Sequence, residues 1–265
     1  MVLVEHVSVA IDGTPVLHDV SFRIETGTVA GYVGPNGAGK TTTMRLLTGA
    51  LKPDTGRVEV GGVDVALDPL GAKRRFGFVP EHGHLYESFT PTEYLAFIGR
   101  MHGIAEPTLA SRSAAHLRFW GLAGAAQQSM TGFSKGMKQK VLLSAAMLHD
   151  PPVLLLDEPL NGLDAHAVQQ FRAILRAQAA VGKTVFYSSH LLDAVERIAD
   201  QVIVIRSGQI VTDGTPEEVM AEAGGGTLED AFSRLTATAD ADEQAAWLER
   251  EAFGRDPSEH EGAAA

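Results

Sequence analysis

Eight residues in the N-terminal part of the chain match the pattern G-x-x-x-x-G-K-[ST], which runs from Gly34 to Thr41. Glycines at these positions let the backbone curl so that successive amides point at phosphate oxygens. The lysine adds a mobile positive charge, and the last hydroxyl can ligate Mg²⁺. A strand pattern before the loop and a helix pattern after it favour this interpretation over an ordinary glycine-rich turn. The expected phosphate-binding residues are Gly34, Pro35, Asn36, Gly37, Ala38, Gly39, Lys40 and Thr41.

Two adjacent carboxylates form the second chemical feature. Asp157 and Glu158 follow the apolar run 153–156 and precede Pro159. Side chains alternate along a strand, so we expect the two carboxylates to point in different directions. One of them can hold the Mg²⁺ shell, while Glu158 can act as a general base or position a water for hydrolysis. A solvated strand end before a proline turn is the alternative, and the phosphate loop disfavours it.

The elements that must position these residues alternate between short β-branched runs and longer helical patterns. We expect strands at residues 2–9, 16–24, 28–33, 57–60, 75–79, 153–156, 184–187 and 202–205. We expect helices at residues 40–50, 93–101, 108–120, 135–149, 164–179 and 191–199. This alternation predicts an α/β fold of the P-loop NTPase type, with a mostly parallel sheet and antiparallel β elements at the N-terminus.

Residues 91–130 contain no strand pattern, which predicts a helical subdomain inserted into the α/β body at about residues 84–150. Three consecutive glycines at 224–226 suggest a hinge. We therefore expect one nucleotide-binding domain over residues 1–226 and an acidic C-terminal extension over residues 227–265. The extension holds ten acids and three bases, so it carries -7 of the chain's net charge of -11.

Composition excludes several classes of function. The chain has no cysteine, so disulfides, thiolate zinc sites and cysteine nucleophiles are excluded. Its net negative charge argues against binding to nucleic acid or to an anionic membrane by overall electrostatic attraction. No stretch approaches the roughly 20 apolar residues of a membrane span, and the N-terminus lacks the pattern of a signal peptide. These observations predict a cytosolic location.

Three further motifs narrow the prediction. Ser134-Lys135-Gly136 opens a helix shortly before Asp157, Asn161–Asp164 follows the acidic strand end, and His190 follows the strand at 184–187. In this order and spacing, the set resembles the ATP-binding subunit of ABC transporters over about residues 1–220. Export-branch members, which transport drugs, antibiotics or lipids, are the most similar. The rival interpretation is a soluble ABC-type ATPase that acts on nucleic acid or protein assemblies.

The resemblance implies a role for each motif. Gly34 to Thr42 would be the Walker A motif, which adds Thr42 to the loop residues, and Asp157 would end Walker B. Glu158 would be the catalytic glutamate and His190 the switch histidine. Residues 161–164 would be the D-loop, and Ser134 and Gly136 would belong to the signature, which contacts the γ-phosphate on a second subunit.

The resemblance also implies cofactors and partners. These are ATP and Mg²⁺, a second copy of the chain or a paralogous ATP-binding subunit, and integral membrane permease subunits, but no nucleic acid. The expected location is peripheral, on the cytoplasmic face of the cell membrane. The rival soluble ATPases of DNA repair usually carry a long coiled-coil insertion before the signature. Here only 94 residues separate Lys40 from Ser134.

The sequence departs from the family pattern at three places. Phe133, Lys135 and Met137 replace residues of the usual Leu-Ser-Gly-Gly-Gln signature. Glu81 stands where the family has the glutamine that reaches the Mg²⁺ shell, and we keep it as a predicted metal ligand. Near Ile11, where the family stacks adenine on an aromatic side chain, the chain has no aromatic residue before Phe22. The preference for ATP over GTP therefore stays open.

Overall fold

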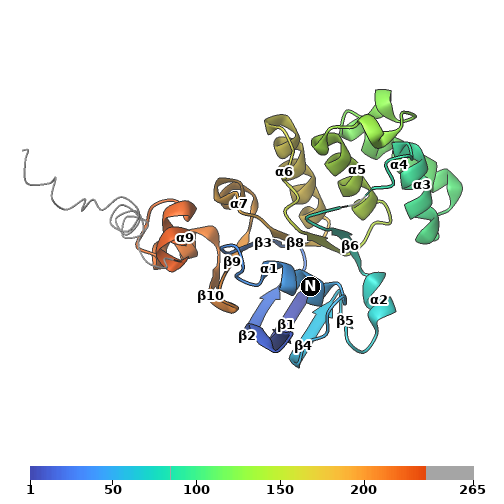
Figure 1. Ribbon diagram of the computed structural model, residues 1–265. Coiled ribbons are helices and arrows are strands. Elements are labelled where there is room, and N and C mark those ends of the chain that lie inside the picture. Colours follow the sequence, from blue (N-terminus) through green and yellow to red (C-terminus); the bar gives the residue numbers. More distant parts are fainter. Residues whose placement is uncertain (84, 237–265) are drawn as a thin grey trace, which may run out of the picture.

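The computed structural model describes residues 1–83 and 85–236, and it contains two β-sheets (Figure 1). The smaller sheet is antiparallel and has the strand order β2-β1-β4-β5. Asp12 and Gly13 form the turn between its first two strands, and both have a positive φ, as a tight hairpin requires. The strands of this sheet are β1 (Val2–Ile11), β2 (Thr14–Ile24), β4 (Thr55–Val60) and β5 (Val63–Asp64).

The larger sheet has the order β10-β9-β3-β8-β7-β6 and is parallel except for β10, which pairs antiparallel with β9. Its central strands are buried along their whole length, as expected for a sheet covered on both faces. The predicted fold class is thereby confirmed. The strands are β3 (Val29–Val33), β6 (Phe76–Val79), β7 (Val153–Leu156), β8 (Thr184–Ser188), β9 (Gln201–Arg206) and β10 (Gln209–Gly214).

The helices cover the two faces of the larger sheet unequally. Helix α1 (Lys40–Leu47) lies on one face, where it shares a core with the smaller sheet. Helices α5 (Lys135–Met147), α6 (Ala165–Ala180) and α7 (Leu192–Ile198) pack on the other face. Alternate residues of one strand therefore enter different cores: Tyr187 faces the helices, whereas Phe186 faces the smaller sheet.

The helical subdomain lies at one end of the molecule in Figure 1. It contains α3 (Pro91–Met101), α4 (Glu106–Phe119), two short 3₁₀ turns at 123–125 and 130–132, and α5. Helix α3 begins at a capping box in which Thr90 and Glu93 exchange hydrogen bonds. Leu95, Leu109 and Trp120 form its buried core. This subdomain carries the start of α5, and therefore the signature residues, beside the body.

Several elements were not predicted from the sequence. They are β5, β10, α2 (Pro69–Lys73), α8 (Pro216–Glu222) and α9 (Leu228–Thr236). Helix α9 lies in the predicted acidic extension at residues 227–265. Its residues Leu228 and Ala231 are nevertheless fully buried, and the helix packs against α7 and α8. The Leu228 amide also donates to Glu196 Oε2 at 2.9 Å. Residues 237–265 lie outside the described residues. Within the described part, none of the helices combines the length and apolarity of a membrane span.

An aromatic cluster holds the two sheets together. Phe22 of β2 stacks on Phe186 of β8 with ring centroids 5.7 Å apart, and Tyr32 of β3 lies 5.1 Å from Phe186. All three rings are buried, and the Tyr32 hydroxyl pairs with Thr43 Oγ1 of α1 at 3.0 Å. The cluster therefore links the smaller sheet, the larger sheet and the helix that follows the phosphate loop.

We predict that Phe186→Ala lowers the free energy of unfolding by about 3–5 kcal/mol, because it removes a fully buried ring and leaves a cavity between the sheets. Urea unfolding followed by circular dichroism measures this change. Val181→Ala is the control, since Val181 is largely exposed at the end of α6, and its effect should stay within about 0.5 kcal/mol. Equal stability of the two variants would contradict the proposed role of the cluster.

Candidate functional site

The phosphate loop connects β3 to α1, and its backbone conformation depends on glycine. Gly39 precedes α1 with φ 113°, a value that L side chains rarely adopt. A Cβ at this position would also lie only 2.6 Å from Leu17 Cδ2. Lys40 Nζ donates hydrogen bonds to the carbonyls of Gly34 at 2.6 Å and of Pro35 at 3.2 Å. These two bonds hold the ammonium group against the loop.

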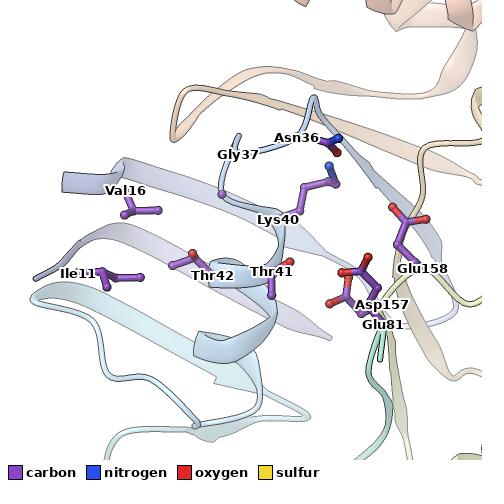
Figure 2. Close-up of a pocket in the computed structure, with 11 residues that line it drawn as sticks. Ile11, Val16, Asn36, Gly37, Lys40, Thr41, Thr42, Glu81, Asp157 and Glu158 are labelled. Atoms are coloured by element: carbon purple, nitrogen blue, oxygen red, sulfur yellow. The ribbon is translucent and has the colours of Figure 1, made fainter. Parts of the chain in front are cut away.

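The loop borders a cavity of about 370 Å³ that collects most of the predicted site residues (Figure 2). This volume lies in the range of ligand pockets. Gly34, Pro35 and Ala38 shape the loop without lining the cavity. Val16 and Ile11 supply an apolar wall at the opposite end from the carboxylates, in agreement with the absence of an aromatic residue for the base. The lining residues are Ile11, Val16, Asn36, Gly37, Gly39, Lys40, Thr41, Thr42, Glu81, Asp157 and Glu158.

Sheet topology explains why three carboxylates meet at this cavity. Strands β6 and β7 are parallel neighbours, so their carboxyl ends lie at the same edge. The Asp157 amide continues their pairing by donating to the Val79 carbonyl at 2.8 Å. Glu81, two residues after β6, is thereby placed beside Asp157 and near Glu158, as Figure 2 shows. The three residues come together although 76 positions separate Glu81 from Asp157.

Asp157 and Glu158 both follow the end of β7 and both line the cavity, so the strand alternation assumed for them does not apply; they differ in their contacts and backbone. Asp157 is buried and accepts a hydrogen bond from the Ser188 hydroxyl at 2.6 Å. Glu158 has φ 47°, which places a non-glycine residue in the left-handed region. Its amide donates to the same Ser188 hydroxyl at 2.9 Å. Ser188 was not predicted as a functional residue, although it lies only two positions before His190, which was.

The predicted switch histidine contacts the predicted catalytic glutamate. His190 Nδ1 lies 2.8 Å from Glu158 Oε2, and the imidazole side chain is 57% exposed while the Glu158 side chain is only 10% exposed. A group at the surface therefore touches the carboxylate that faces the cavity. This contact lets the imidazole orient the glutamate.

The electrostatics of the site combine burial with like charges. Burial raises the pKa of Asp157, and the charges of Glu81 and Glu158 raise it further, while the Ser188 hydrogen bond and Lys40 oppose them. Burial lowers the pKa of Lys40, and the three carboxylates oppose that shift. Lys40 is the one cationic side chain among the described residues that line the cavity. The cavity thus holds three carboxylates and one ammonium group, and this excess of negative charge favours binding of an additional cation there.

The donor set fits Mg²⁺. Thr41, Asp157 and Glu81 offer a hydroxyl and two carboxylates, which are hard oxygen ligands. Among the residues that the structure describes, no three His, Cys, Asp or Glu side chains form a complete metal cage. Mg²⁺ usually needs no such cage, because it binds through one or two carboxylates together with waters and substrate phosphates.

The predicted signature residues lie outside this cavity in the described part of the chain. Ser134 is exposed at the N-cap of α5, where its hydroxyl accepts a hydrogen bond from the Met137 amide at 3.2 Å. Gly136 packs so closely on the predicted D-loop that a Cβ would clash with the Gly162 carbonyl oxygen. Asp164 then caps α6 by accepting from the Ala167 amide at 2.8 Å. The signature and the D-loop thus form one exposed, tightly packed surface.

Comparison with known proteins agrees with this arrangement. Residues 17–161 match the family described as "ABC transporter". The linearmycin resistance ATP-binding protein LnrL of Bacillus subtilis (strain 168) is 32% identical over 228 residues, which cover 86% of this chain and 73% of that protein. The Nod factor export ATP-binding protein I of Bradyrhizobium diazoefficiens is 35% identical over 207 residues, which cover 78% of this chain and 68% of that protein.

The solved structure of an ATP-binding subunit of an ABC transporter superposes with a TM-score of 0.84 and 31% identity. The superposition covers 89% of this chain and all of that subunit, so it includes both the α/β body and the inserted helices. The phosphate loop, the paired carboxylates and the helical subdomain therefore occur together in the expected order and in the expected fold. The chain belongs to the ABC transporter family.

Proposed function

We propose that this chain hydrolyses ATP and that the hydrolysis drives export of a substrate through separate membrane permease subunits. The observation that carries the proposal is the single cavity shared by the phosphate loop and Glu158. Phosphate-binding groups and a candidate base at one cavity suit phosphoryl transfer to water. Two relatives described above are ATP-binding proteins, one for linearmycin resistance and one for Nod factor export. Their functions favour export over import.

Phosphate binding follows from the loop. Gly37, Gly39, Lys40, Thr41 and Thr42, at the end of the loop and the start of α1, line the cavity, and the amides and dipole of a helix N-terminus favour anions. Lys40 Nζ, which bonds to loop carbonyls, is positioned to reach the β- and γ-phosphates. Bound Mg²⁺ would neutralise developing phosphate charge, with Thr41, Asp157 and Glu81 as the protein ligands.

Glu158 is the proposed general base. Its carboxylate lines the cavity, and His190 fixes one of its oxygens at 2.8 Å. In this proposal the two acids serve different atoms: Asp157 serves the cation and Glu158 the attacking water. Glu158 accepts the proton of the attacking water as the terminal phosphoryl bond breaks. His190 then distinguishes the site before and after loss of the γ-phosphate.

The active site is completed by a second subunit in this proposal. Ser134 and the Gly136 amide form an exposed anion-binding helix end that the chain does not place at its own cavity. A second copy, or a paralogous ATP-binding subunit, would bring its own helix end to the γ-phosphate, and two chains would enclose two nucleotides. Hydrolysis removes the γ-phosphate contacts and opens the pair again.

The helical subdomain offers the proposed surface for the permease. Tyr86, Phe89 and Phe97 form an aromatic cluster, and Met101 extends it along α3; we call these four residues the α3 patch. Tyr86 is 60% and Met101 is 71% exposed, which is unusual for large apolar side chains that gather in one place. The patch follows Glu81 closely in sequence, so a change at the cavity can reach it. The chain would then sit peripherally on the cytoplasmic face of the membrane.

The rival function is a soluble ATPase that acts on nucleic acid or protein assemblies. The net charge of -11 disfavours binding to a phosphate backbone. The described residues between α1 and α5 form short strands and short helices rather than a long coiled coil. The exposed α3 patch suits a protein partner, and the transport relatives favour a permease as that partner.

We predict that Glu158→Gln lowers the ATP turnover rate at least about a hundredfold, because the amide cannot accept the proton of water. Binding of ATP should persist, since the loop and Lys40 are unchanged, and ATP-bound dimers should accumulate. Phosphate release and analytical ultracentrifugation with Mg·ATP measure both effects. Glu217→Gln, at an exposed position on α8, is the matched control and should behave as the wild type. Turnover within twofold of the wild type in the Glu158 variant would refute its assignment as the base.

We also predict that Phe97→Asp releases the chain from membranes, since a carboxylate would have to be desolvated at the permease contact. Basal ATP hydrolysis should stay within about twofold of the wild type, because the α3 patch lies apart from the cavity. Quantitative immunoblots of membrane and soluble fractions from the native host measure this. Leu70→Asp on α2 is the control, because Leu70 is a large apolar side chain that is 71% exposed, against 39% for Phe97, and lies outside the patch. A wild-type chain found only in the soluble fraction would favour the rival function.

A further inference from the structure

Ser188, the last residue of β8, carries a fully buried hydroxyl that touches both residues of the Asp157-Glu158 pair. Its Oγ lies 2.6 Å from Asp157 Oδ1 and 2.9 Å from the Glu158 amide nitrogen. Strand β8 is the parallel neighbour of β7, with Leu156 opposite Tyr187. The residues that follow these two, Asp157 and Ser188, are therefore also neighbours. The sheet register itself therefore places this hydroxyl at the carboxylates.

The directions of the two hydrogen bonds are fixed by chemistry. An ionised carboxylate only accepts, and a backbone amide only donates. A hydroxyl has one proton to donate and lone pairs to accept. Ser188 must therefore donate to Asp157 and accept from the Glu158 amide. One small side chain satisfies both groups, and a methyl group in its place would satisfy neither.

Each bond has a structural consequence. The bond to Asp157 Oδ1 restrains rotation of the carboxylate and leaves Oδ2 for the cavity. The bond from the Glu158 amide supports a backbone with φ 47°, a conformation that costs free energy for a residue with a side chain. His190 holds the other end of Glu158 through Oε2. Glu158 is thus fixed at its backbone by Ser188 and at its carboxylate by His190.

We propose that Ser188 is a positioning residue for ATP hydrolysis, whose hydroxyl orients Asp157 toward the cation of the nucleotide and holds Glu158 in its left-handed backbone conformation. This inference rests on the proposed roles of Asp157 and Glu158. Partners that orient metal-ligating carboxylates typically change metal affinity or activity about 10- to 100-fold when they are removed. Ser188 acts through those two residues and is not among the residues that line the cavity.

Ser144 provides a matched comparison for a buried serine without this role. It is also fully buried, but its hydroxyl donates only to the Lys140 carbonyl of its own helix, at 2.8 Å. Ser144→Ala therefore removes a buried hydroxyl without touching a carboxylate. Ser188→Thr keeps the hydroxyl of Ser188, and Ser188→Cys replaces it by a weak donor of similar shape.

The experiment measures binding of a fluorescent ADP analogue as Mg²⁺ is titrated, so it does not depend on turnover. A second titration in EDTA gives the affinity for the metal-free nucleotide. Phosphate release gives the rate of ATP hydrolysis, and thermal unfolding shows whether each variant is folded. These four readouts are collected for the wild type, Ser188→Ala, Ser188→Thr, Ser188→Cys and Ser144→Ala.

For Ser188→Ala we expect the half-saturating Mg²⁺ concentration to rise about tenfold and hydrolysis to fall about 10- to 100-fold. Nucleotide affinity in EDTA should stay within about twofold, because the phosphate loop is intact. Ser188→Thr should recover most of both losses, and Ser144→Ala should match the wild type. If Ser188→Ala does not fold, Ser188→Cys supplies the same comparison, with a loss of the same sign.

Wild-type Mg²⁺ dependence and turnover in folded Ser188→Ala, or in Ser188→Cys where the alanine variant is unfolded, would overturn the inference. Equal losses in Ser188→Ala and folded Ser188→Thr would also overturn it, since the hydroxyl would not be the cause. Failure of the proposed function looks different. In that case the wild type itself would not hydrolyse ATP, or Glu158→Gln would keep full turnover.

Discussion

The convergence of three carboxylates on one lysine at the edge of the larger sheet is the constraint on which the site depends. Glu81, Asp157 and Glu158 border the same cavity as Lys40, partly out of water, where like charges repel more strongly than in solvent. Such a cluster persists only because the parallel strands β6 and β7 hold its backbone in place. A nucleotide with its cation relieves the charge imbalance, so the fold prepares the cavity for that ligand.

The rest of the architecture serves this arrangement. The aromatic cluster of Phe22, Tyr32 and Phe186 joins the two sheets, and the hydrogen bond between Tyr32 and Thr43 ties α1, which follows the phosphate loop, to them. Ser188 and His190, both at the end of β8, fix the orientation of the acids. The inserted helices carry Ser134 away from the cavity and expose it. In the proposed dimer, the cavity of one chain and the Ser134 surface of the other would together form the complete site.

Much of this could be predicted from the sequence because the relevant residues are contiguous. The phosphate loop and the Asp157-Glu158 pair each lie in one short segment, and their neighbouring strands are strongly apolar. Ser188 could not be predicted, because its proposed role depends on the register between β7 and β8. That register pairs residues about 30 positions apart in the sequence. Helix α9 was not predicted, because acidic residues in its first turn gave the segment the composition of a solvated tail. Only two of its positions, Leu228 and Ala231, are buried. Strand β10 was missed because its mixed polar composition reflects an edge position beside β9.

In the proposed mechanism, phosphates and their cation occupy the Lys40–Asp157 cavity and a second chain completes the site. A crystal structure of the chain with Mg²⁺ and a slowly hydrolysed ATP analogue would show both features at once. We expect two chains facing each other, with Thr41 and Asp157 at the cation and Ser134 of each chain at the γ-phosphate bound by the other. A nucleotide bound by a single chain, with Ser134 still exposed to solvent, would contradict it.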